Sequence, residues 1–347
     1  MASEPLAFPS LIGQTRAGLE ALCREAGVKP IHAEALLAHV FRHGGRDPAA
    51  IPGLPRRLAA WLAEHETPLA LHLVRDERAS DGTRKMLLAM PDGKRVETVL
   101  IPGQGRLTQC VSTQVGCAMD CAFCLTARGG LERNLTTEEM VAQVLAAERL
   151  HSQRPRNLVL MGMGEPLHNF DAVARFVRIA TEPKGLAFSP RRVTLSTVGH
   201  VPGIRRMIEE RLPCNLALSL NATDDATRAR IMPVNRRWPI AEVLEWTRRF
   251  SRLGRKRVLI EYVLLAGVND SDENARRLLE LLADLPCVIN LLPFNPHPGA
   301  DFARPSEARV SAFRRILVDA GRIAVVRESR GREISAACGQ LKARAVA

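Results

Sequence analysis

Apolar residues recur at helical spacing over the first 65 residues of the chain. Residues 16–27 (RAGLEALCREAG) carry such a stripe, and the glycine that closes the segment is a typical helix stop signal. Segments 31–43 and 55–65 repeat the pattern, with prolines between them. We therefore expect a small helical module at the start of the chain.

The pattern then changes to short alternating segments. Residues 70–77, 84–90 and 95–101 are strand-like, and Asp-Gly pairs supply turn signals between them. These segments predict a small antiparallel sheet that joins the helical module to the rest of the chain.

From residue 106 onward, strand-like and helix-like segments alternate. The candidate strands are 106–113, 157–161, 192–197, 214–220, 257–264 and 287–293. The candidate helices are 136–151, 169–180, 201–210, 239–253, 271–283 and 306–320. The first of these helices opens with Thr136-Thr137-Glu138-Glu139, a capping pattern. Consecutive βα units of this kind predict a parallel sheet with right-handed crossovers.

A closed eight-unit barrel takes about 250 residues, whereas about 220 are available here at the same size per unit. The pattern therefore predicts an α/β fold, a partial (β/α)6 TIM-like barrel with a small N-terminal helical accessory domain. A doubly wound sheet is the alternative. The expected domains are 1–69 for the helical module, 70–105 for the antiparallel extension and 106–347 for the barrel.

Polar residues gather where the predicted parallel strands end, which is where barrel enzymes carry their chemistry. They are Cys117 to Cys124 after the first strand, Gly162 to Glu165 after the second, Ser196-Thr197 at the third, Ser219 and Asn221 at the fourth, and Asn295 after the sixth. We expect these residues to form one site.

The formal net charge is +12, and arginines occur in pairs and triplets such as Arg191-Arg192 and Arg255-Lys256-Arg257. RNA or DNA is the natural partner for such a chain, although solvated arginine-rich surfaces give the same composition. Aromatic residues make up only 4%, so we expect contacts to phosphates rather than base stacking. The sequence has neither a membrane-length apolar run nor a signal-peptide pattern at its start, so a cytoplasmic location is expected.

Four of the eight cysteines fall between residues 110 and 124. Cys117, Cys121 and Cys124 form a C-x3-C-x2-C run. Three thiolates can hold a 4Fe–4S cluster and leave one iron free for a small molecule. In radical S-adenosylmethionine (SAM) enzymes that iron chelates SAM, whose reductive cleavage releases a 5′-deoxyadenosyl radical. Zinc is the alternative, but zinc sites favour paired C-x2-C or Cys/His sets.

Gly162-Met163-Gly164-Glu165-Pro166 follows an apolar strand. Glycines at a strand end let the backbone approach a ligand closely, and Glu165 could accept from the amine or ribose of the cofactor. The motif is weak alone, and after the cysteine run it becomes a candidate cofactor loop.

The chain resembles the RlmN/Cfr family of radical SAM RNA methyltransferases. The matching segments are VETVLIP (96–102), CVSTQVGCAMDCAFC (110–124), MGMGEPLHN (161–169), LSTVG (195–199), LALSLNA (216–222), IMPVN (231–235), LLPFNPHPG (291–299) and SRGREISAACGQL (329–341). They occur in the family's order, and the helical module matches in kind more than in letters.

The resemblance implies a role for each matching position. The cluster ligands would be Cys117, Cys121 and Cys124. The SAM contacts would be Gly164, Glu165, Ser196, Ser219, Leu220, Asn221 and Asn295. Cys338 would carry the methyl group, Cys110 would be the second cysteine, and Glu97 the proposed general base. Taken alone, Cys338 and Cys110 would be core residues and Glu97 a solvent-facing strand residue.

The resemblance also implies the reaction. Two SAM molecules serve each turnover: the first methylates Cys338, and the second yields the radical that joins this methyl carbon to an adenine ring of RNA. Cys110 then attacks Cys338 and frees the product as a disulfide forms. The implied partners are large-subunit rRNA, possibly tRNA, and a reducing electron donor such as flavodoxin, with a monomeric chain and no membrane.

Three alternatives stay open from the sequence. The methyl group is expected at carbon 2 of adenosine, with carbon 8 as the alternative. A radical enzyme acting on a protein or small molecule, and a metal-stabilised RNA-binding module, are the others. One departure from the family is Asn221, where many members have histidine, and an asparagine can still hydrogen-bond a ribose. The chain also ends six residues after Leu341, earlier than relatives with a longer basic tail, which places some RNA contact in doubt.

Overall fold

The computed structural model describes residues 6–42, 51, 53–65, 67–103, 105–151, 154–254, 257–297 and 299–342. Arg255 and Lys256, the first residues of one basic triplet, lie outside the described residues, as do the first five residues of the chain.

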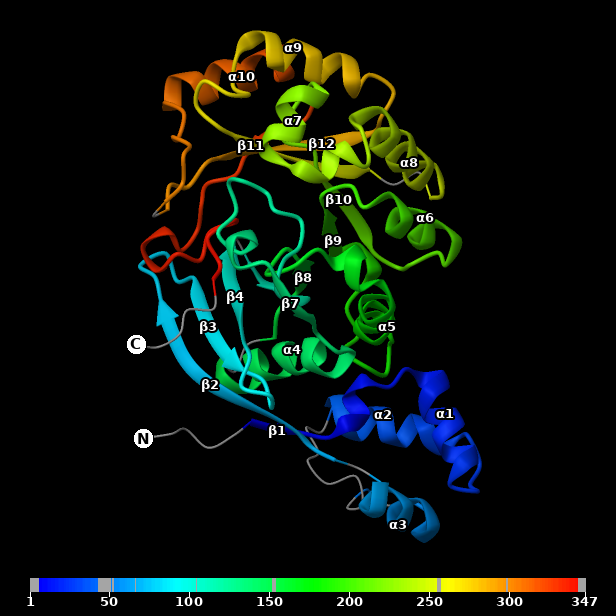
Figure 1. Ribbon diagram of the computed structural model, residues 1–347. Coiled ribbons are helices and arrows are strands. Elements are labelled where there is room, and N and C mark those ends of the chain that lie inside the picture. Colours follow the sequence, from blue (N-terminus) through cyan, green and yellow to red (C-terminus); the bar gives the residue numbers. More distant parts are fainter. Residues whose placement is uncertain are drawn as a thin grey trace.

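One sheet of eleven strands runs through the molecule (Figure 1). Its first part is antiparallel and comprises β1 (Leu6–Phe8), β2 (Leu69–Arg78), β3 (Arg84–Ala89) and β4 (Arg95–Gly103). Strand β4 pairs antiparallel with β5, the first parallel strand, so the extension and the barrel share one continuous sheet.

The second part of the sheet is parallel. Each strand pairs with the next one along the chain, in the order β5 (Arg106–Cys110), β8 (Asn157–Leu160), β9 (Val193–Thr197), β10 (Asn215–Ser219), β11 (Val258–Leu264), β12 (Cys287–Pro293) and β13 (Ala324–Val326). A doubly wound sheet would reverse its strand order, so this order excludes that alternative and confirms the partial barrel.

Helices follow the parallel strands and lie around the outside of the sheet (Figure 1). They are α4 (Thr137–His151), α5 (Phe170–Thr181), α6 (Val201–Glu209), α7 (Asp225–Ile231), α8 (Ile240–Arg252), α9 (Asp272–Leu281) and α10 (Glu307–Asp319). Tyr262 of β11 packs against Phe313 of α10, with ring centroids 5.5 Å apart. Because side chains alternate along a strand, Glu261 beside it points to the inner face.

The short elements were the ones that the sequence pattern missed. Strand β13 adds a seventh parallel strand, helix α7 follows β10, and a hairpin of β6 (Gln114–Gly116) and β7 (Leu131–Asn134) flanks the cysteine run. Single 3-10 turns lie at Ser10–Gly13, Ala127–Gly129, Pro166–Asn169, Pro190–Arg192, Pro233–Arg236 and Arg332–Ile334. Segments this short carry too few residues for a hydrophobic period to be recognised.

The N-terminal module contains α1 (Arg16–Glu25), α2 (His32–Arg42) and α3 (Arg56–His65). It is not purely helical, because β1 joins the sheet beside β2. Arg149 of α4 ties this start of the chain to the barrel: its Nη1 donates to the Ala7 carbonyl at 2.8 Å, and its guanidinium lies 4.1 Å from the Phe8 ring centroid. Within the described part of the chain, no helix combines the length and apolarity needed to cross a bilayer.

The predicted cap of α4 is present. The Thr136 hydroxyl accepts from the Glu139 amide at 3.3 Å, and the Glu139 carboxylate accepts from the Thr136 amide at 2.9 Å. This reciprocal pair satisfies two backbone donors that the helix start would otherwise leave unpaired. The helix therefore begins where the hairpin β6–β7 ends.

We expect Thr136→Ala to lower the free energy of unfolding by about 1 kcal/mol, because one helix-capping bond is lost. Urea denaturation of the protein followed by circular dichroism measures this loss. Thr67→Ala, at an exposed threonine outside any helix, is the matched control and should leave the midpoint unchanged. Equal midpoints for Thr136→Ala and the unsubstituted protein would contradict the expected contribution.

Candidate functional site

The three cysteines of the C-x3-C-x2-C run lie on a loop that follows the first parallel strand. Backbone bonds hold this loop at both ends: the Cys117 amide donates to the Gly130 carbonyl at 2.8 Å, and the Ala122 amide donates to the Ile231 carbonyl at 2.9 Å. The second bond ties the loop to the end of helix α7. The cysteine positions are therefore set by two separate parts of the barrel.

The thiols are close enough to affect one another's protonation. Burial raises the pKa of Cys117 to about 12 and that of Cys121 well above its usual range. The negative charge of Cys124 adds to both shifts. Three crowded thiols become stable thiolates only beside positive charge, and a metal group supplies that charge while releasing the thiol protons.

The number and type of these donors indicate what kind of group the loop could hold. Among the residues described in the structure, no three His, Cys, Asp or Glu side chains converge tightly enough to hold one metal ion. An iron–sulfur cubane is wider than a single ion and holds its thiolates further apart. Three cysteine thiolates are a donor set that fits a 4Fe–4S cluster with one iron left open.

The glycines of the predicted cofactor loop lie against residues 111–114. A Cβ on Gly162 would come within 2.8 Å of the Ser112 amide nitrogen, and one on Gly164 within 2.6 Å of Gln114 Cβ. Gly164 also has φ of 104°, which side chains other than glycine rarely adopt. Both glycines are required for the two loops to approach each other. The motif predicted a close approach to a ligand instead, and that contact stays a prediction.

Glu165 joins the ends of two strands. Its carboxylate accepts from the Leu167 amide at 3.0 Å and from the Val198 amide at 2.9 Å, and its own amide donates to Gln114 Oε1 at 2.8 Å. Burial raises the pKa of Glu165 to about 7. Glu165 therefore lies at the end of β8 and links it to the end of β9, and its contact with SAM stays a prediction.

The other predicted SAM contacts come from the ends of β9, β10 and β12. Ser196 and Ser219 are half-buried, and Leu220 is fully buried. Asn295 is buried, and its Oδ1 has no hydrogen-bond partner within the described structure. A buried polar atom without a partner is costly, so Asn295 fits a position that a bound cofactor would satisfy.

Asn221 is held by the protein in a way that the sequence did not indicate. Its φ is 59°, a left-handed conformation that asparagine tolerates better than most residues. Its Oδ1 accepts from the Val263 amide at 2.8 Å, and its Nδ2 lies 3.2 Å from Met232 Sδ. These bonds give Asn221 a structural role at the end of β10, and a ribose contact stays a prediction.

The C-terminal segment brings Cys338 to the cysteine loop. The Leu125 amide donates to the Gly339 carbonyl at 2.7 Å, and the Thr126 hydroxyl donates to the Leu341 carbonyl at 2.6 Å. In Figure 1 this segment, drawn in red, lies beside the cysteine loop. Residues more than 200 positions apart in the sequence thus form one site.

Cys338 and Cys110 interact electrostatically across this site. Cys338 is exposed at the surface of the site, whereas Cys110 is buried at the end of β5. Loss of hydration of the Cys338 thiol within the site raises its pKa to about 11, and the negative charges of Glu261 and Cys124 raise it further. Burial, followed by the charge of Cys338, raises the pKa of Cys110 above its usual range. All eight cysteines are free thiols in this structure.

The alternation of Glu97 with apolar neighbours predicted a solvent-facing strand residue, and this prediction is wrong. Glu97 is 4% exposed, and its Oε1 lies 3.1 Å from Lys85 Nζ, a side chain that is also buried. Its Oε2 accepts from the Lys342 amide at 2.8 Å. The alternation was misleading because both faces of β4 are covered. Burial raises the pKa of Glu97, with Lys85 opposing the shift.

Two polar features of the site were not predicted from the sequence. The Asn290 amide donates to Glu261 Oε1 at 2.7 Å, and Arg327 Nε donates to Asn290 Oδ1 at 2.9 Å. This row crosses the inner face of β11 and β12 beside Cys338, and burial raises the pKa of Glu261 to about 6. A glutamate within the apolar strand VLIEYVL was a signal that could have identified it. The second feature is Arg228, a fully buried arginine on helix α7, and nothing in the sequence around it indicated its burial.

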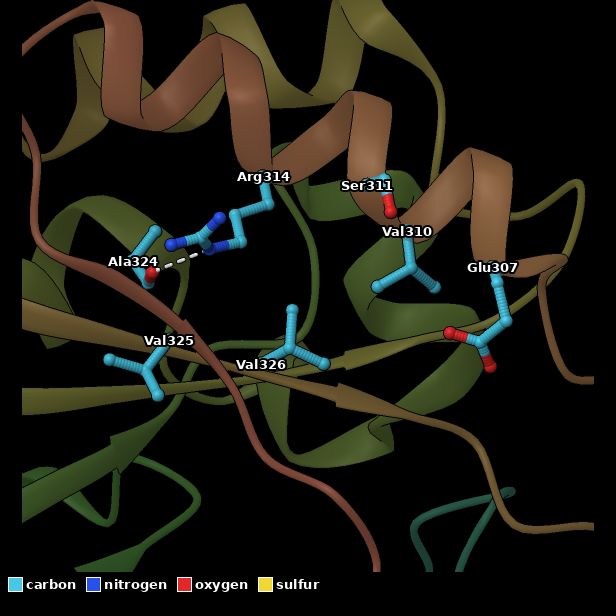
Figure 2. A pocket seen from close by; sticks show the side chains of 7 residues that line it. All are labelled: Glu307, Val310, Ser311, Arg314, Ala324, Val325 and Val326. Carbon is cyan, nitrogen blue, oxygen red and sulfur yellow. Dashed lines mark hydrogen bonds between the residues drawn. The ribbon is translucent and has the colours of Figure 1, made fainter.

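The cavity in Figure 2 is separate from this site. It has a volume of about 400 Å³ and lies between α10 and β13 at the edge of the sheet; its lining residues are Glu307, Val310, Ser311, Arg314, Ala324, Val325 and Val326. Arg314 Nε donates to the Ala324 carbonyl at 3.1 Å and so occupies a carbonyl of the edge strand. The lining contains no nucleophile or metal-ligand set, and it contributes nothing to the chemistry of the cysteines.

Comparison with known proteins identifies close relatives. Residues 111–279 match the model of the Radical SAM superfamily. The chain is 45% identical over 343 residues to the Dual-specificity RNA methyltransferase RlmN of Rhodospirillum rubrum, covering 96% of this chain and 80% of the relative. It is 46% identical over 328 residues to the protein of the same name from Syntrophobacter fumaroxidans, and the match covers 94% of this chain and 95% of the relative.

A solved structure is also similar over nearly the whole chain. The crystal structure of a radical SAM methyltransferase from Sphaerobacter thermophilus superposes with a TM-score of 0.88. The two chains are 46% identical, and the match covers 96% of this chain and 99% of the other. The likeness therefore extends beyond the barrel to the helical module and the C-terminal segment.

We expect Gly162→Ala to destabilise the protein by about 1–3 kcal/mol, because the added methyl group would collide with the backbone of residues 111–112. Thermal unfolding measures this change. Gly129→Ala is the matched control, since a Cβ there meets nothing within 4 Å. Equal melting temperatures for the two variants would show that the loops can separate without cost.

Proposed function

Because the chain belongs to the RlmN family of radical SAM RNA methyltransferases, we propose that it methylates carbon 2 of an adenosine in large-subunit rRNA and in tRNA. The relatives' name, with its words dual-specificity and RNA, supports the substrate class. The net charge of +12 agrees with a polyanionic partner. As in its superfamily, the cofactors are a 4Fe–4S cluster and SAM.

The observation that carries the proposal is the meeting of two cysteine sets at one end of the barrel. Cys117, Cys121 and Cys124 would hold the cluster, and Cys338 lies close enough to Cys124 for their charges to interact. A radical SAM enzyme without a cysteine intermediate needs only the first set. The second set, Cys338 with Cys110, supports a methyl carrier and a thiol that releases it.

The cofactor would lie between the cluster loop and the ends of β8, β9, β10 and β12. Gly164 and Glu165 would border it on one side, Ser196, Ser219 and Leu220 on another, and Asn221 and Asn295 on the third. When bound, the cluster and SAM supply a methyl group and a 5′-deoxyadenosyl radical.

Cys338 would carry the methyl group as S-methylcysteine. A thiolate is the form that accepts a methyl group, so the high pKa of Cys338 means that its proton must leave during the transfer. After the carbon is joined to the adenine ring, Cys338 is bonded to RNA. The Cys110 thiolate would then attack the Cys338 sulfur and form a disulfide, while the departing carbon keeps the electron pair of the broken S–C bond and takes up a proton to become the methyl group of the product.

Glu97 is the proposed acceptor of the proton that leaves the adenine ring. Burial raises its pKa, which favours proton uptake. Its oxygens contact Lys85 and the Lys342 amide in this structure, so Glu97 would exchange one of these partners when it accepts the proton.

The remaining partners follow from this chemistry. A low-potential one-electron donor such as flavodoxin would reduce the cluster. We propose that the chain acts as a monomer in the cytoplasm, where RNA is present and free thiols persist.

We expect Cys338→Ala to abolish RNA methylation while keeping iron content and reductive SAM cleavage, because the carrier sulfur is lost and the cluster ligands are intact. Cys110→Ala should instead accumulate a covalent protein–RNA adduct, which gel electrophoresis detects. Cys287→Ala, at a core cysteine, is the matched control with normal activity. RNA methylation by Cys338→Ala at the normal rate would contradict the role of Cys338 as methyl carrier.

We expect RNA treated with the enzyme to contain 2-methyladenosine. Mass spectrometry of nucleosides, with synthetic standards for both isomers, distinguishes it from 8-methyladenosine. The second product would assign the chain to carbon-8 chemistry and leave the roles of the cysteines unchanged.

A further inference from the structure

Arg228 is a fully buried charged residue on helix α7. Its guanidinium donates to main-chain carbonyls at the ends of two strands: to Val198 at 2.6 Å, to Ser219 at 3.2 Å and to Leu220 at 2.9 Å. It also donates to Asn235 Oδ1 at 2.9 Å. Each nitrogen of the guanidinium thus donates at least one hydrogen bond, and these bonds join the ends of β9 and β10 that border the cofactor site.

The charge of Arg228 is not neutralised by these neutral acceptors. Across the described chain, no carboxylate oxygen lies within salt-bridge distance of its guanidinium. Asp225 is a carboxylate whose charge acts on Arg228, and this residue is exposed and bonded to the Ile240 amide and to Asn235. Burying a cation without a negative partner costs free energy. A buried arginine at this position therefore indicates that a negative group lies nearby when the protein holds its cofactors.

The group that fits is the cluster held by the cysteine loop. Helix α7 ends against that loop, where the Ile231 carbonyl accepts from the Ala122 amide, and Cys121 packs in the same apolar cluster as Ile231 and Met232. The positive charge of Arg228 lowers the pKa of Cys121, opposing the effect of burial. Charges interact strongly across such a dry interior.

We propose that Arg228 is a positioning residue whose buried positive charge stabilises the reduced, more negative state of the cluster. The step is the transfer of one electron from a low-potential donor to the cluster, with no bond made or broken at Arg228. Net charge and hydrogen bonding near a cluster are the features that set its potential. This inference rests on the cluster ligands of the proposed function.

The test compares the full chain with its Arg228→Gln and Arg228→Lys variants after anaerobic reconstitution with iron and sulfide. A redox titration followed by electron paramagnetic resonance gives the midpoint potential of each. We expect Arg228→Gln to shift the ratio of reduced to oxidised cluster about tenfold towards oxidised, which is about 59 mV for one electron. Arg228→Lys keeps the charge and should recover more than half of this shift.

The lysine variant separates charge from structure. It loses the forked bonds to the strand ends, so a purely structural role predicts equal shifts for both variants, and that result overturns the proposal. Arg230→Gln, at an exposed arginine on the same helix, is the matched control and should titrate like the unsubstituted protein. If Arg228→Gln fails to fold, Arg228→Lys alone tests the proposal. A midpoint potential equal to that of the unsubstituted protein supports the proposal, and a potential lowered by about 59 mV overturns it.

The cluster ligands are tested separately. Cys121→Ala should lose iron and sulfide, which chemical analysis measures. Full loading of Cys121→Ala would contradict the ligand assignment, and with it the proposed function. Normal loading of Arg228→Gln with an unchanged potential contradicts only the role of Arg228.

Discussion

The site depends on the docking of the C-terminal segment onto the cysteine loop. Two hydrogen bonds, from the Leu125 amide to Gly339 and from the Thr126 hydroxyl to Leu341, fix this contact. A third, from the Lys342 amide to Glu97, anchors the segment to β4. Without them Cys338 would have no defined position relative to Cys124 or Cys110. The chemistry therefore requires a long-range backbone contact as much as it requires any single side chain.

The continuous sheet makes this docking possible. Strand β4 supplies Glu97, and its neighbour β5 supplies Cys110, because the antiparallel and parallel parts meet between these two strands. The cysteine loop leaves from the same end of β5. One junction in the sheet thus places the anchor of the C-terminal segment, the second cysteine and the cluster loop side by side.

Much of this could be predicted from the sequence. The alternation of strands and helices indicated the partial barrel, because long amphipathic segments carry a clear period. The glycines of the motif were singled out for a close approach to a ligand, whereas the structure shows that they permit the close approach of the loops at 111–114 and 162–165. The burial of Glu97 could not be predicted, since its partner Lys85 belongs to another strand. The burial of Arg228 could not be predicted either, because it depends on hydrogen bonds to backbone carbonyls, and these leave no signal in the sequence.

The two thiols proposed for the methyl transfer differ in access. Cys338 is open to solvent on a loop with left-handed residues on either side, Ser335 and Gly339, whereas Cys110 is enclosed at the end of a strand. Soluble oxidants and alkylating reagents therefore reach the loop sulfur first and the strand sulfur last. Of these two thiols, Cys338 would be oxidised first, and the still reduced Cys110 could then trap its sulfenic acid as a disulfide, which an external reductant must reduce before the next turnover.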